Sequence, residues 1–161
     1  MAEKYYRKIT DFYDSSKFEL CEKPSHTTLE NPVSTCGVLF YRFNKGNLQL
    51  LLTKYRDEKW PNLDDFGGRI DKEDDDLIDT AIRETCEETN KLILLERYEL
   101  EKIKLFYNSS YKFATFLVQV NNNNTFFDNC DVFGDKEFSE DIFWHNFNSN
   151  FQKKETFIKI T

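Results

Sequence analysis

Two glycines and three glutamates within one stretch of the chain are its most informative residues. Gly67 and Gly68 stand side by side, and the run Arg83–Glu88, which reads RETCEE, follows them. Carboxylate oxygens are the ligands that hard divalent cations prefer, and glycine lets a backbone approach a metal or a phosphate closely. A cation bound here would act as a Lewis acid and would generate a hydroxide-like nucleophile from water. The pattern therefore predicts a site for a hard divalent cation.

The charge distribution points the same way. From Asp64 to Glu88 the chain has eleven Asp or Glu and three Arg or Lys, a net charge of −8 over 25 residues, whereas the whole chain carries −7. Acidic side chains at this density repel one another unless a cation neutralises them. We expect a bound divalent metal to do so, because an oxygen-only ligand set selects Mg²⁺ or Mn²⁺ over zinc.

A helix is predicted to carry the glutamates. Apolar and small residues recur at three- and four-residue steps from Leu77 to Thr89, so one stripe of the helix faces a core. Asp76 is suited to cap its first turn, and Asn90 tolerates the left-handed conformation that ends a helix. At about 100° per residue, the three glutamates lie beside one another on the flank of that stripe.

The spacing of these residues resembles the Nudix box of the Nudix hydrolase family. That box reads Gly, five residues, Glu, seven residues, then Arg-Glu-hydrophobic-x-Glu-Glu-x-Gly-hydrophobic. The matching positions in this chain are Gly68, Arg83, Glu84, Glu87 and Glu88. The resemblance is specific within the box and extends loosely, through the order of strands, over residues 33–148.

The chain departs from that box at three places. The interval from the second glycine to Arg83 is one residue longer than the family's, which we interpret as an insertion in the acidic loop ahead of the helix. The first Glu of the box is then represented by Asp75. The late Gly is Asn90, and the hydrophobic position after it is Lys91.

The resemblance implies an α/β fold, a Nudix-like α/β/α sandwich whose mixed central sheet carries one catalytic helix. It also implies a hydrolase that cleaves a phosphoanhydride with Mg²⁺, for which Mn²⁺ substitutes. The implied catalytic residues are Arg83, Glu84, Glu87, Glu88 and Glu140, and the implied metal ligands are Gly68, Glu84, Glu87 and Glu88. Arg83 is expected to pair with Asp75 or with a helix glutamate and to hold that acid in register.

The general base and the substrate contacts are defined less closely. Glu140 is favoured as the base over Glu137, and both follow the long central strands. Trp144 resembles a residue that some family members place near a nucleobase, although a Trp that closes the sheet against the last helix fits at least as well. Three cations that precede the glycines are expected to neutralise phosphate charge on the substrate: Lys54, Arg56 and Lys59.

Three functions stay open. The first is hydrolysis of a nucleoside diphosphate derivative, which covers nucleotides, dinucleoside polyphosphates and the capped 5′ end of an mRNA. The second is hydrolysis of a diphosphoinositol polyphosphate, against which the chain lacks a triple glycine and a lysine cluster. The third is a non-catalytic binding module of the same fold, against which all three box glutamates are present.

Other site classes are excluded by the residues. A calcium-binding EF-hand loop starting at Asp71 would need glycine where Asp76 stands and glutamate where Ile82 stands. The chain has no P-loop, no Gly-x-Ser-x-Gly elbow and no Cys-x-x-Cys pair.

Length and composition indicate one soluble domain. The resemblance implies that the Nudix hydrolase domain spans residues 32–161, after an N-terminal extension over residues 1–31. Four scattered cysteines, no signal peptide and no run of about 20 apolar residues favour a cytoplasmic protein without a membrane partner. The acidic total argues against broad binding to duplex nucleic acid. The oligomeric state is left open, with a homodimer as one option.

The remaining elements are read from apolar runs and turn residues. A hairpin is predicted about Asn44–Asn47, and short helices are predicted near Tyr5–Tyr13 and after Asn148. The predicted strands are Cys36–Phe43, Leu48–Tyr55, Leu63–Ile70, Leu92–Leu95, Glu99–Tyr107, Tyr111–Val120 and Glu140–Trp144.

Overall fold

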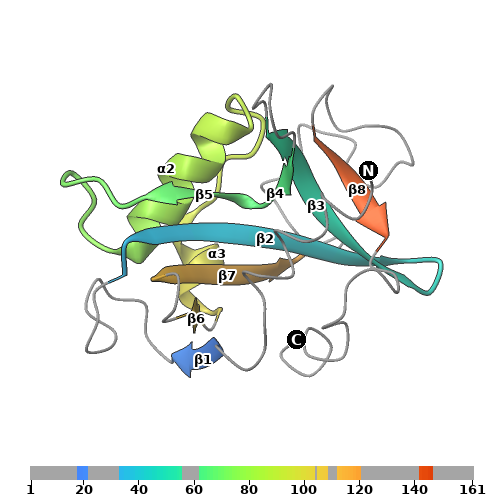
Figure 1. The fold of residues 1–161 in the computed structure, drawn as a ribbon, viewed down its shortest axis with the longest axis horizontal. Coiled ribbons are helices and arrows are strands. Elements are labelled where there is room, and N and C mark those ends of the chain that lie inside the picture. The colour runs from blue at the N-terminus through green and yellow to red at the C-terminus, as the bar shows by residue number, and fades with distance from the viewer. Residues whose placement is uncertain are drawn as a thin grey trace.

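The structure, a computed structural model, describes residues 18–21, 33–55, 62–103, 105–108, 112–120 and 142–146. These residues form one mixed eight-stranded sheet with two helices (Figure 1). In chain order the elements are β1 (Phe18–Cys21), β2 (Thr35–Asn44), β3 (Asn47–Tyr55), β4 (Asn62–Asp64), β5 (Phe66–Arg69), α2 (Leu77–Glu88), α3 (Arg97–Glu101), β6 (Leu105–Asn108), β7 (Phe113–Gln119) and β8 (Ile142–Asn146).

Strand β2 is the centre of the sheet. It pairs in parallel with β7 on one side, and on the other side it pairs antiparallel with β5 through its first half and with β3 through its second half. The order of neighbouring strands across the sheet is β1-β6-β7-β2-β3-β4, and β8 also pairs with β3. The predicted α/β class with a mixed sheet is therefore confirmed. The helix predicted after Asn148, which would cover the second face, lies outside the described residues.

The strand that carries Gly67 and Gly68, which we call the glycine strand, was predicted as one element over Leu63–Ile70. It is two short strands separated at the buried residue Asp65, because β4 pairs with β3 whereas β5 pairs with β2. This exchange of partners places Gly67 opposite Gly37 and Gly68 opposite Cys36. The glycines thus enter the middle of the sheet.

Helix α2 begins and ends as predicted. The Asp76 side chain accepts a hydrogen bond from the Asp79 amide (2.9 Å), and Asn90 has a φ of 53° just beyond the last turn. The buried stripe packs on the sheet through Leu77, Ile78, Ala81 and Thr85. The hairpin prediction is also confirmed, since Lys45 and Gly46 adopt positive φ between β2 and β3.

Two strand predictions after the helix are wrong. Residues 92–95 alternate between exposed Leu92 and Leu94 and buried Ile93 and Leu95, yet they form no strand, and the Ile93 amide bonds instead to Thr89 Oγ1. The predicted strand 99–107 begins inside helix α3, and only β6 remains of it. Alternation of exposed and buried side chains is typical of a strand, but a strand also needs a neighbouring strand to pair with.

Strand β1 was not predicted. It lies within the segment 1–31 that was expected to be an extension, and it pairs antiparallel with β6. The helix predicted near Tyr5–Tyr13 lies outside the described residues. Within the part of the chain that the structure describes, no helix is long and apolar enough to cross a membrane.

Candidate active site

The site forms where α2 crosses the glycine strand. A Cβ at position 68 would lie 2.5 Å from Cδ and Oε2 of Glu84 and 2.6 Å from its Oε1, so the carboxylate occupies the space that a side chain would need. One turn further along α2, Glu88 Oε2 accepts a hydrogen bond from the Gly67 amide (3.3 Å). Two of the three predicted glutamates therefore converge on the paired glycines.

The two glycines serve different purposes. A Cβ at Gly67 would lie 2.8 Å from Cα of Gly37 and 3.0 Å from the Cys36 carbonyl oxygen, so Gly67 lets two backbones pack. Gly68 instead leaves room for a functional side chain. A Cβ at position 67 would meet fixed backbone, whereas a Cβ at position 68 would meet the movable end of the Glu84 side chain.

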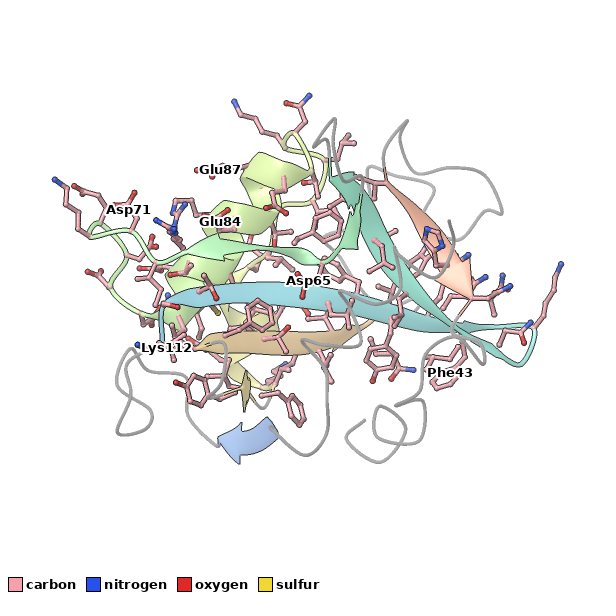
Figure 2. The ribbon with its side chains drawn as sticks, viewed as in Figure 1. Phe43, Asp65, Asp71, Glu84, Glu87 and Lys112 are labelled. Atoms are coloured by element: carbon pink, nitrogen blue, oxygen red, sulfur yellow. The ribbon has the colours of Figure 1, made fainter. Side chains whose placement is uncertain are left out.

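Arg83 links the acids of the site. Its Nη1 donates to Glu84 Oε1 (2.8 Å) and lies 3.6 Å from Glu87 Oε2. Its Nε and Nη2 donate to the two carboxylate oxygens of Asp74 (3.1 and 2.8 Å), and Nη2 also donates to the Arg69 carbonyl (3.0 Å). The expected pairing with a helix glutamate is confirmed. Figure 2 shows Glu84 and Glu87 on neighbouring turns of α2.

The other expected partner of Arg83 was wrong, because Asp74 and not Asp75 receives its guanidinium. The Asp74 side chain is 5% exposed and also accepts hydrogen bonds from the Asp71 amide and the Thr80 hydroxyl (2.9 Å each). The hydrogen bonds from Arg83 lower the pKa of Asp74 to about 2. Leaving seven residues between the acid and Arg83 selected Asp75, whereas leaving five residues between Gly68 and the acid selects Asp74. The second count was the signal that sequence reasoning missed.

The residues present fit a hard divalent cation. Their donors are all carboxylate oxygens, and Gly68 keeps the backbone beside Glu84 free of a side chain. Glu87 is 59% exposed and accessible to a cation from solvent. Within the described residues, no three His, Cys, Asp or Glu side chains are grouped closely enough to hold a metal ion as they stand. Arg83 supplies the positive charge beside Glu84 and Glu87 in this arrangement.

Trp144 lies in β8, opposite Leu51 of β3, and packs partly buried against the core. The Arg42 guanidinium sits 4.3 Å from the centroid of its ring and donates from Nε to Gln49 Oε1 (2.7 Å). The indole is thus held by a cation–π contact, and its role in binding a substrate ring stays a prediction. The alternative interpretation, a Trp that closes the sheet, agrees equally with this packing.

The described part of the structure does not place the side chains of the remaining predicted residues. Lys54 belongs to β3, but only its backbone is described. The other predicted contacts and bases lie outside the described residues: Arg56, Lys59, Glu137 and Glu140.

The chain is similar to known proteins in two comparisons. A family model described as the NUDIX domain matches residues 32–157. Two crystal structures of an Ap4A hydrolase from C. elegans are similar to the chain, each over 80% of this chain and 85% of theirs. One is 24% identical with a TM-score of 0.44, and the other, a binary complex, is 21% identical with a TM-score of 0.40. No curated protein matches the chain.

Proposed function

Because this chain belongs to the NUDIX family and is a Nudix-type pyrophosphohydrolase, we propose that it cleaves a phosphoanhydride bond in a nucleoside diphosphate derivative, with Mg²⁺ as its cofactor. Mn²⁺ would substitute, since it prefers the same oxygen ligands. The observation that carries the proposal is the Glu84 carboxylate seated against Gly68, with Glu88 on the adjacent amide.

Glu84, Glu87 and Glu88 are the proposed metal ligands, together with the Gly68 carbonyl. When bound, Mg²⁺ supplies Lewis acidity toward the phosphoryl oxygens and lowers the pKa of a water molecule. The three carboxylates lie within two turns of one helix, so a rigid element orients them.

Arg83 is proposed to orient Glu84 rather than to contact the substrate. Its guanidinium is fixed by two bonds to Asp74, which leaves Nη1 directed at Glu84. A planar, bidentate contact of this kind fixes direction as well as charge. Glu140 is proposed as the general base that takes the proton from the attacking water.

The substrate is proposed to span from the glutamates toward β3 and β8. Lys54 and Arg56 would neutralise the distal phosphate, and Trp144 would stack on the nucleobase. The capped 5′ end of an RNA carries the same chemical groups and belongs to this substrate class. The scattered cysteines, of which Cys36 and Cys86 are free thiols, support a reducing compartment such as the cytoplasm.

A substrate panel tests the proposal. The protein is incubated with Mg²⁺ and nucleoside diphosphate derivatives, a dinucleoside polyphosphate, a capped RNA and a diphosphoinositol polyphosphate, and the products are read as phosphate, pyrophosphate and nucleoside monophosphate. We expect nucleoside monophosphate from the nucleotide substrates. Much faster turnover of the inositol compound, with equal turnover of every base, would overturn the proposed substrate class.

Trp144→Leu separates base recognition from chemistry within the same panel. Leu preserves apolar packing against the core but removes the ring, so nucleotide binding should weaken by about 1–3 kcal/mol while turnover of a phosphate-only substrate stays unchanged. An equal loss on both kinds of substrate would assign Trp144 to the fold instead.

A further inference from the structure

An arginine outside the glycine strand and the catalytic helix holds the start of that helix. Arg97, the first residue of α3, donates from Nη2 to Asp76 Oδ2 (2.6 Å) and from Nη1 to Asp79 Oδ1 (2.7 Å) and Asp76 Oδ1 (3.2 Å). One guanidinium therefore bridges the N-cap residue of α2 and an acid of its first turn. The contact spans 21 residues of sequence.

The acids that Arg97 joins also organise the end of the acidic loop. Asp76 Oδ1 accepts from the Asp79 amide, and Asp79 Oδ2 accepts from the Asp75 amide (2.9 Å each). Two carboxylates this close repel each other, and the positive helix end offsets only part of that repulsion. The Arg97 guanidinium forms an ion pair with each carboxylate and so offsets more of that repulsion, and its pKa is raised mainly by the hydrogen bond with Asp76.

The junction that Arg97 clamps leads directly to the metal ligands. Asp74 lies two residues before the N-cap and fixes the guanidinium of Arg83, which in turn donates to Glu84. A shift of the helix start relative to the loop would therefore change the direction in which Arg83 presents Glu84 to Gly68. Positions that support ligands through such contacts affect metal affinity although they do not touch the metal.

We propose that Arg97 is a positioning residue of the active site, which sets metal affinity through Asp76, Asp74 and Arg83. The inference rests on the proposed function, because it takes Glu84 as a metal ligand. The side chain of Arg97 is 45% exposed, so ion-pair energy at the surface is not its main contribution. Its contribution is the fixed geometry between the acidic loop and α2.

The test compares two single variants and their combination. Arg97→Gln removes the guanidinium, whereas Asp76→Asn removes the charge but keeps a residue that caps a helix equally well. The Mn²⁺ dissociation constant is measured by electron paramagnetic resonance of the free ion, and the melting temperature is measured beside it. Lys102→Gln, which removes a charge at the end of the same helix α3, is the matched control.

We expect either variant to raise the Mn²⁺ dissociation constant roughly three- to thirtyfold, with the double variant no worse than the worse single variant. Arg97→Lys should recover only part of the affinity, because an ammonium cannot bridge two carboxylates with a planar fork. Lys102→Gln should leave the constant unchanged. This pattern distinguishes positioning from general stability.

A lower melting temperature in Arg97→Gln with an unchanged dissociation constant would overturn the inference and make Arg97 a purely structural residue. If Arg97→Gln fails to fold, Asp76→Asn gives the same comparison. Wild-type protein that binds no Mn²⁺ would overturn the proposed function and this inference together. If the wild type binds Mn²⁺ and hydrolyses nucleotides, and both single variants have the same Mn²⁺ dissociation constant as the wild type, the inference is overturned and the proposed function stands.

Discussion

Gly68 and Glu84 share one small space, since a Cβ at position 68 would lie 2.5 Å from the carboxylate carbon of Glu84. The contact joins the glycine strand to the helix across 15 intervening residues and combines the two halves of the sequence motif in one site. It also separates the steric roles of the paired glycines, of which sequence reasoning had assigned only Gly68 to the box and to the metal.

Replacement of the two glycines should therefore have different consequences. Gly68→Ala displaces the end of a flexible side chain, so we expect the protein to fold and its catalytic rate to fall by about 10²-fold, the usual cost of misplacing a catalytic group by about an ångström. Gly67→Ala meets the backbone of Gly37, so it should lower the melting temperature instead. Thermal unfolding and steady-state kinetics on both variants check this contrast. Equal melting temperatures, or full activity of Gly68→Ala, would refute it.

Asp74 should govern stability at low pH. Its pKa falls from 3.8 to about 2 in the folded protein, chiefly through Arg83, so the unfolded chain binds the proton more tightly. The stability that it contributes, about 2 kcal/mol, is fully present above the unfolded pKa and is lost as the pH falls toward 2. Asp74→Asn should remove that contribution in urea titrations at pH 7.

Asp75→Asn is the matched control for Asp74. Asp75 is exposed, and its amide, not its carboxylate, makes the hydrogen bond to Asp79. We expect its stability to stay within about 0.5 kcal/mol of wild type, as for ordinary surface changes. A larger loss of stability from Asp75→Asn than from Asp74→Asn would favour the original assignment of Asp75 to the first Glu of the box.

His145 should make the stability of the protein depend on pH in a second, higher pH range. Burial lowers its pKa from 6.5 to about 4, so the folded state disfavours the proton that the unfolded state accepts. Stability is therefore full above about pH 6.5 and decreases as the pH falls toward 4. In His145→Gln the free energy of unfolding should change less across this window. A variant with the same slope as wild type would exclude His145 as its source.

The predictable part of this fold is the part with local signals. Asp76 and Asn90 marked both ends of α2 because caps and left-handed stops depend on a few neighbouring residues. The hairpin followed from Gly46 in the same way. By contrast, β1 depends on pairing with β6, and the break at Asp65 depends on the pairing of β5 with β2. Both partners are far away in sequence, so no local pattern encodes them.

The site was predictable to the same extent. The glutamates, the glycines and Arg83 were identified from their spacing, and the geometry brings Glu84, Glu88 and Arg83 together. Asp74 was missed because one extra residue allowed two alignments of the acidic loop. Arg97 was missed because its spacing to Asp76 follows from tertiary structure, not from the period of a helix.

Metal should stabilise the folded protein. Carboxylates held together by α2 repel one another, and a cation that binds only the native state raises stability by mass action. We expect millimolar Mg²⁺ or Mn²⁺ to raise the melting temperature, and the increase to shrink in Glu87→Gln. Calcium, whose preferred ligand distances are longer, is the comparison ion. A melting curve that does not respond to Mg²⁺ would count heavily against the assigned ligands.

The most direct test of the central claim is the rate at which nucleoside monophosphate is released from a nucleoside diphosphate derivative at saturating Mg²⁺, by wild-type protein and by Glu88→Gln. The amide keeps the volume of Glu88 and an oxygen for the Gly67 amide but removes the ligand charge. Glu73→Gln, in the exposed loop, is the control. Asp79 is unsuited to that purpose, because it pairs with Arg97. We predict release by the wild type and by Glu73→Gln, and a rate roughly two to four orders of magnitude lower in a folded Glu88→Gln. A Glu88→Gln variant that keeps half of the wild-type rate would contradict the account.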